Sequence, residues 1–138
     1  MGKAIKLTTT YNHPIEDVWD ALTNKDAMSE WLMPCNIEPI VGHQFQFKTK
    51  SYPGFNGIVN CEILEVIKHQ KLSFSWSGGS LKNTIVTFEL KTNGTKTELK
   101  LEHTGFEGFF NKVIVSRILA NGWFNKILII QLPKYLTK

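Results

Sequence analysis

The stretch DVWDALTNKDAMSEWLMP, residues 17–34, decides how the fold begins, because it contains two amphipathic helical patterns in tandem. Val18 and Leu22 are one helical turn apart and place an apolar face on the first pattern. Met28 and Trp31 have the same kind of spacing in the second pattern. The sequence therefore predicts two short helices with separate apolar faces, one after the other.

Polar residues and prolines mark the ends of both helices. Asn12 is a candidate N-cap for the first helix, and Pro14 suits its first turn, where a missing N–H costs nothing. Thr23 or Asn24 can cap the second helix, and Pro34 ends it.

Alternation of apolar and polar residues predicts strands at 5–11 and between residues 42 and 103. The clearest pair flanks Asn93-Gly94, a dipeptide typical of hairpin turns. Successive strands with short connections predict an antiparallel meander. Within each strand the apolar side chains are expected on one face: Phe45 with Phe47, Leu72 with Phe74 and Trp76, Val86 with Phe88 and Leu90, and Leu99 with Leu101.

The last segment, from about residue 107 to residue 136, returns to helical spacing. We interpret it as one long helix in which Gly122 costs about 1 kcal/mol relative to alanine. Helices segregated from an antiparallel sheet define an α+β fold. The prediction is a helix-grip fold, in which a curved sheet surrounds the long helix and the two short helices close one end.

A second apolar arc on the long helix raises the question of partners. Leu119, Trp123 and Ile130 fall on this arc, apart from the arc that a sheet would cover. The two small helices can cover it in a monomer, which is the favoured interpretation. The alternative is a homodimer or a chaperone contact along the same arc, because large uncovered apolar patches usually mark interfaces.

Composition narrows the class of protein. The 138 residues suit a single domain spanning residues 1–138. The net charge of +4 does not predict a nucleic-acid surface, because Arg117 is the only arginine and the lysines are dispersed. Cys35 and Cys61 are far apart, so no metal site or cofactor is expected. No secretory signal or membrane-spanning run is present, so a cytoplasmic protein without membrane insertion is expected.

The segments VWDALTNKDAMSEWLMP, KLSFSW and NGWFNKILIIQLPKYL, in this order, resemble START-like (SRPBCC, helix-grip) domains. The match is to homologues of the heat-shock protein 90 ATPase activator, and it covers most of the chain. The resemblance implies a curved sheet that grips the C-terminal helix around an apolar cavity. Related domains bind lipids, sterols, polyketides or plant hormones, and some act as cyclases or hydrolases.

Candidate ligand contacts follow from the expected cavity face. Trp76 shares its strand face with Leu72 and Phe74, and His103 has the strand parity of Leu99 and Leu101. Each candidate can instead be an ordinary core residue. The predicted ligand-binding residues are Trp31, Phe47, Trp76, Phe88, Leu99, His103, Phe110 and Ile114.

Catalytic signatures are missing from the sequence. It contains no nucleophile elbow, phosphate loop or metalloprotease motif. Glu62 and Glu65 have opposite strand parity, which argues against a carboxylate pair. No catalytic residue is therefore assigned.

The favoured function is binding of a small hydrophobic or amphipathic ligand between the sheet and the C-terminal helix. One alternative is a chaperone-linked stress-response or protein-interaction module. Another is an enzyme acting on a hydrophobic substrate, with His103 as its acid or base.

Overall fold

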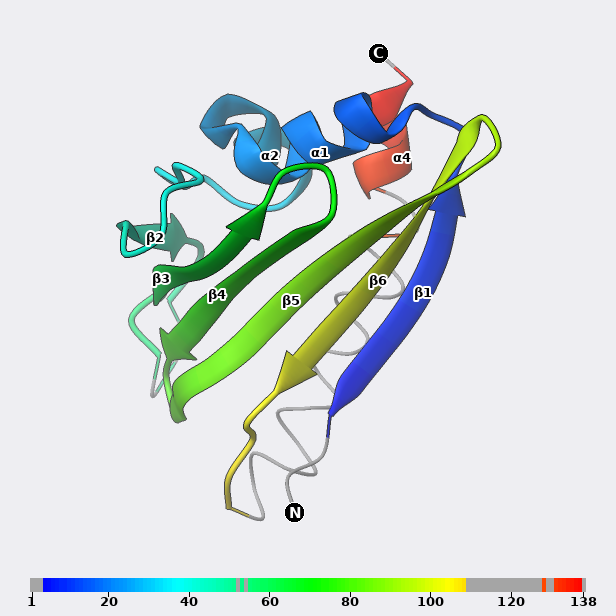
Figure 1. The fold of residues 1–138 in the computed structure, drawn as a ribbon. Helices are drawn as coiled ribbons and strands as arrows, with labels where there is room; N and C mark the ends of the chain where they lie inside the picture. The colour runs from blue at the N-terminus through cyan, green and yellow to red at the C-terminus, as the bar shows by residue number, and fades with distance from the viewer. Residues whose placement is uncertain (1–3, 52, 54, 109–127, 129–130, 138) are drawn as a thin grey trace.

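A six-stranded antiparallel sheet forms the centre of the fold in the computed structural model, which describes residues 4–51, 53, 55–108, 128 and 131–137. The strand order is β1-β6-β5-β4-β3-β2, so the first strand pairs with the last (Figure 1). The strands are β1 (Ile5–Tyr11), β2 (Gln44–Lys48), β3 (Ile58–Ile67), β4 (Lys71–Gly78), β5 (Leu81–Asn93) and β6 (Lys96–Thr104).

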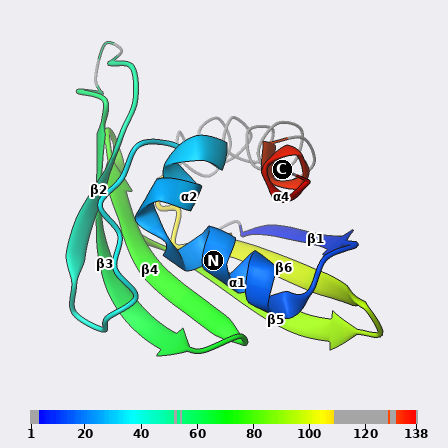
Figure 2. The ribbon, with the colours of Figure 1, turned by 90° about the horizontal axis from the view of Figure 1, so that it is seen from above.

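The sheet bends into two wings. Viewed from above, β2, β3 and β4 form one wing, while β5, β6 and β1 form the other (Figure 2). The helices α1 (Ile15–Thr23) and α2 (Lys25–Trp31) lie inside the bend. The antiparallel meander and the two tandem helices predicted from the sequence are therefore confirmed.

The two helices are held together by a side-chain contact as well as by their short connection. Asn24 accepts hydrogen bonds from the N–H groups of Asp26 and Ala27, which makes it the N-cap of α2 as predicted. Trp31 Nε1 donates to the carbonyl oxygen of Ala21 over 2.7 Å. The indole thus fixes the position of α2 against α1.

Two predicted boundaries are wrong by one or two residues. The N-cap of α1 is Pro14, not Asn12, and no side chain caps this helix. The hairpin between β5 and β6 turns at Gly94 and Thr95, because Asn93 still pairs with Lys96. The φ of Gly94 is +65°, a conformation that glycine adopts without steric cost.

The predicted helix over residues 107–136 is described only in part. Residues 107 and 108 lie outside any helix, so a helix does not begin at Glu107 as predicted. The helix α4 (Leu132–Leu136) packs against α1 and α2. Residues 109–127 and 129–130 of the predicted helix lie outside the described residues, and these include Leu119, Trp123 and Ile130. No helix in the described part of the chain is long and apolar enough to cross a membrane.

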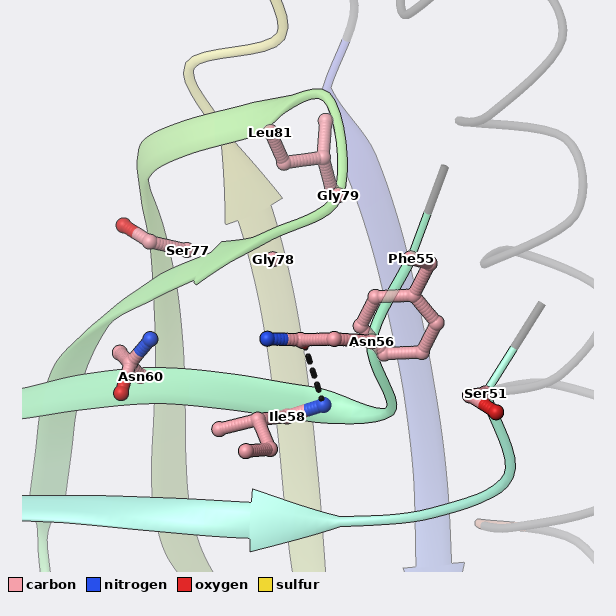
Figure 3. A pocket seen from close by; sticks show the side chains of 9 residues that line it. All are labelled: Ser51, Phe55, Asn56, Ile58, Asn60, Ser77, Gly78, Gly79 and Leu81. Carbon is pink, nitrogen blue, oxygen red and sulfur yellow. Dashed lines mark hydrogen bonds between the residues drawn. The ribbon is translucent and has the colours of Figure 1, made fainter. Parts of the chain in front are cut away.

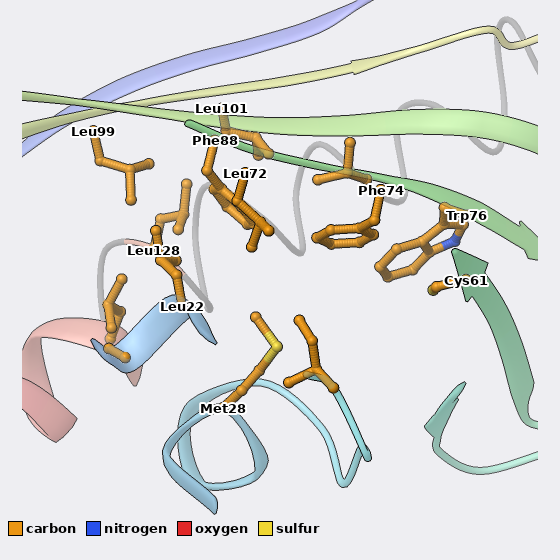
Figure 4. Packing of buried hydrophobic residues seen from close by; sticks show 14 of the residues in the cluster. Leu22, Met28, Cys61, Leu72, Phe74, Trp76, Phe88, Leu99, Leu101 and Leu128 are labelled. Carbon is orange, nitrogen blue, oxygen red and sulfur yellow. The ribbon is translucent and has the colours of Figure 1, made fainter. Parts of the chain in front are cut away.

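The core lies on the concave face of the sheet. Side chains of β4, β5 and β6 point toward Leu22 and Met28 of the small helices (Figure 4). Phe45, Phe47 and Phe74, here called the aromatic cluster, are all buried, and the Phe45 ring lies 5.4 Å from both of the other rings. Strand alternation thus sends the predicted apolar side chains to one face, as expected.

Candidate functional site

His103 is a polar side chain on this apolar face. It lies on β6 between Ile5 of β1 and Val86 of β5, and its side chain is fully buried. Its strand parity predicted this position. The sequence could not predict its surroundings, which come from strands far apart in the chain.

Thr84 supplies the hydrogen bonding around the imidazole. Its Oγ1 atom lies 2.9 Å from Nε2 of His103 and donates to the carbonyl oxygen of Trp76 over 2.7 Å. The other ring nitrogen, Nδ1, is buried and has no hydrogen-bond partner among the described residues. A buried polar atom without a partner costs about 1–3 kcal/mol, so native proteins have few of them.

Two aromatic rings enclose the imidazole. Its ring centre lies 5.5 Å from that of Trp76 and 4.8 Å from that of Phe106. Burial lowers the pKa of His103 from 6.5 to about 4, so the side chain is neutral near pH 7. Trp76, Thr84, His103 and Phe106 are here called the His103 group.

Two clefts lie near Thr84, the one member of the His103 group that lines either of them. Thr84 and Leu81 contribute to a cleft of about 260 Å³ whose other walls are residues 80, 82, 105, 107 and 108. Leu81 also lines a second, open cleft of about 690 Å³, which Phe55 and Asn56 border from the other side (Figure 3). The hydrogen-bond partner of His103 therefore lies beside accessible space.

Several predicted ligand contacts belong to one row of rings. The row runs from Phe88 through Phe74, Phe47 and Trp76 to His103, with neighbouring ring centres 5.5–6.1 Å apart.

The other predicted contacts lie elsewhere or outside the described residues. Leu99 is fully buried two residues before Leu101 on β6. Trp31 is buried on α2 with its N–H bonded to Ala21. Phe110 and Ile114 lie outside the described residues, and a ligand contact at any predicted position stays a prediction.

Sequence reasoning missed Thr84 and Phe106. Thr84 shares the strand parity of Val86 and Phe88, so a polar residue on an apolar face was a readable signal. Phe106 follows Gly105, whose φ of +93° lies outside the extended conformation of a strand. Strand alternation therefore could not predict which way the Phe106 side chain points.

The described residues include neither a metal-binding cluster nor a carboxylate beside His103. No group of three or more His, Cys, Asp or Glu side chains among them could hold a metal ion. Among the described residues, a hydroxyl and two aromatic rings contact His103, and no carboxylate orients it as a base. A bulge between Ile63 and Glu65 interrupts the alternation on which the parity argument for Glu62 and Glu65 relied. Glu65 forms an ion pair with Lys71 over 3.0 Å.

Comparison with known proteins identifies the fold's relatives. A family model described as "Activator of Hsp90 ATPase homolog 1-like protein" matches residues 12–136. No curated protein matches the chain.

Solved structures resemble the chain over nearly all of its length. A Mesorhizobium loti protein is 27% identical, with a TM-score of 0.86, and the match covers 98% of this chain and 97% of that one. An HSP90 activator from Plasmodium falciparum is 23% identical, with a TM-score of 0.73 and coverage of 92% and 91%. The Aha1 dimer from Colwellia psychrerythraea is 16% identical, with a TM-score of 0.76 and coverage of 93% and 92%.

Proposed function

The chain belongs to the Activator of Hsp90 ATPase homolog 1-like family, and from this premise we propose that it binds a small hydrophobic or amphipathic molecule beside His103. The proposed site lies on the concave face of the sheet, with Trp76 and His103 in contact with the ligand. Phe47, Phe88 and Leu99 provide the adjoining apolar wall.

The observation that carries this proposal is the Nδ1 atom of His103, which has no hydrogen-bond partner among the described residues. The aromatic rings around it would pack equally well against phenylalanine, which needs no hydrogen bonds. A histidine there instead introduces a buried polar atom that the described protein residues leave unsatisfied. Ligand sites are built in this way, from an apolar wall with a few polar groups that orient the occupant.

Native mass spectrometry of freshly purified protein tests the proposal directly. We expect a co-purified small molecule, or saturable binding of a naphthalene-sulfonate dye that the folded protein alone retains. Unfolded protein at the same concentration is the control for nonspecific dye binding. A chain that carries no molecule and binds no apolar probe would contradict the proposal.

A chaperone contact is the second candidate function. The family match supports it, and so do Ile40 and Val41, whose side chains are 60% and 64% exposed in the connection between α2 and β2. If this surface contacts an Hsp90-type chaperone, Val41→Asp should weaken binding to the purified chaperone. Thr92→Asp adds the same single negative charge at an exposed position of β5 and is the control for the change of charge alone. Equal binding by both variants and the unmodified protein would remove this surface from the contact.

A further inference from the structure

We propose that the molecule bound beside His103 presents a neutral hydrogen-bond donor, such as an alcohol, a phenol or an amide N–H, to Nδ1. This inference rests on the proposed function and deepens it by naming the chemical class of the ligand. It also excludes a carboxylate as the group that contacts the imidazole.

The position of one proton carries the argument. The Thr84 hydroxyl has a single hydrogen, and that hydrogen is donated to the carbonyl oxygen of Trp76. Toward Nε2 of His103, Thr84 Oγ1 can therefore act only as an acceptor. Nε2 must carry the N–H, because a hydrogen bond at 2.9 Å needs a donor.

The other nitrogen follows from this assignment. A neutral imidazole has one N–H, so Nδ1 bears a lone pair and no hydrogen. The lone pair is buried, and no described residue donates to it. Only a group with a hydrogen to donate can satisfy it, which excludes a ketone, an ether or an ester carbonyl.

The charge of the imidazole excludes a carboxylate. A carboxylate would require a proton on Nδ1, and therefore an imidazolium ion. Among the described residues, the side chains that face His103 are Ile5 from β1, Val86 and Thr84 from β5, Trp76 from β4 and Phe106, and none of these five is charged. Burial among these groups keeps the pKa of His103 low, which favours the neutral ring.

Three naphthalene probes of similar shape separate the possibilities. We expect 2-naphthol to bind about fivefold to tenfold more tightly than 2-methoxynaphthalene, in which a methyl group replaces the donor hydrogen. At pH 7.5, 2-naphthoate should bind more weakly than 2-naphthol. Calorimetry measures all three affinities. Equal binding of 2-naphthol and 2-methoxynaphthalene, or tighter binding of 2-naphthoate, would overturn the assignment.

Two variants examine the mechanism. In His103→Phe the ratio of the 2-naphthol affinity to the 2-methoxynaphthalene affinity should fall to about one, because the variant has no lone pair to accept the donor hydrogen. In Thr84→Val the proton on the ring is no longer held at Nε2. The preference for 2-naphthol should then shrink, and 2-acetylnaphthalene, which only accepts hydrogen bonds, should bind more tightly than it does to the unmodified protein. An unchanged preference in Thr84→Val would show that the hydroxyl does not set the proton's position.

The three probes are compared on the unmodified protein, so this test does not depend on whether a variant folds. If no probe binds, the proposed function fails, and this inference fails with it. If 2-naphthol and 2-methoxynaphthalene bind equally well, the apolar site stands and only the donor requirement is wrong.

Discussion

The aromatic cluster and the His103 group are both buried on the concave face, yet they differ in one chemical respect. Phe45, Phe47 and Phe74 present only carbon and hydrogen to one another, with ring centres 5.4–6.1 Å apart. His103 is buried to the same degree but contributes a nitrogen that no described residue satisfies. Burial alone therefore does not separate core from site, whereas the satisfaction of polar atoms does.

The largest effect should come from the aromatic cluster. Phe74 contacts the rings of Phe45, Phe47 and Phe88, so Phe74→Ala leaves a cavity that its neighbours cannot fill. We expect the free energy of unfolding to fall by about 3–5 kcal/mol in denaturant titrations. Ile85→Ala, at a side chain 38% exposed on β5, is the control and should cost less than about 1 kcal/mol. A loss below about 1.5 kcal/mol for Phe74→Ala would mean that the cluster is loosely packed and is itself a candidate site.

The pH dependence of stability should distinguish the His103 group. The folded pKa of His103, about 4, lies below the unfolded value of 6.5. As the pH falls from 6.5 to 4, the unfolded chain gains a proton that the folded chain does not bind, so stability is lost. A gap of this size corresponds to about 3 kcal/mol.

Denaturant titrations at pH 7 and pH 4 measure this loss. Other groups also titrate over the range, so His103→Phe is the reference, and the unmodified protein should lose about 3 kcal/mol more than this variant. Equal losses would show that His103 is solvated or partnered in the folded state.

The smallest effect should come from removing the imidazole at pH 7. His103→Phe loses the hydrogen bond from Nε2 but also removes the Nδ1 atom, to which no described residue donates, so the free energy of unfolding should change by no more than about 1 kcal/mol.

Tyr11→Phe is the matched control, because the buried Tyr11 hydroxyl has a partner in the carbonyl oxygen of Leu128, 2.8 Å away. Tyr11→Phe should lower the free energy of unfolding by about 1 kcal/mol or more, because it leaves the buried carbonyl of Leu128 without its donor. A loss of several kcal/mol in His103→Phe would mean that Nδ1 has a structural partner.

The sequence predicted the fold better than the site because the two depend on contacts of different range. The alternation of Phe45 and Phe47, or of Leu99 and Leu101, is local and determines which side chains share a face. The same rule predicted the burial of His103. The rule fails between Ile63 and Glu65, where a bulge changes the alternation and neither glycine nor proline marks the position.

The chemistry of the site depends on pairings between strands. Thr84 and His103 are 19 residues apart, and their contact follows from the register of β5 with β6. The hydroxyl's second partner, the Trp76 carbonyl, follows from the register of β4 with β5. No pattern within one strand contains these relations, so the protonated nitrogen could not be predicted from the sequence.

Locating the proton on the imidazole ring of His103 tests the proposed donor-binding site most directly. Two-bond ¹H–¹⁵N correlation NMR of protein with labelled histidine shows which ring nitrogen bears hydrogen, and the spectrum of His103→Phe identifies the resonances. We predict a proton on Nε2 and a bare Nδ1 at pH 7, with the Nδ1 resonance shifting when 2-naphthol is added. A proton on Nδ1 in the free protein, or an Nδ1 resonance unmoved by saturating 2-naphthol, would contradict the account.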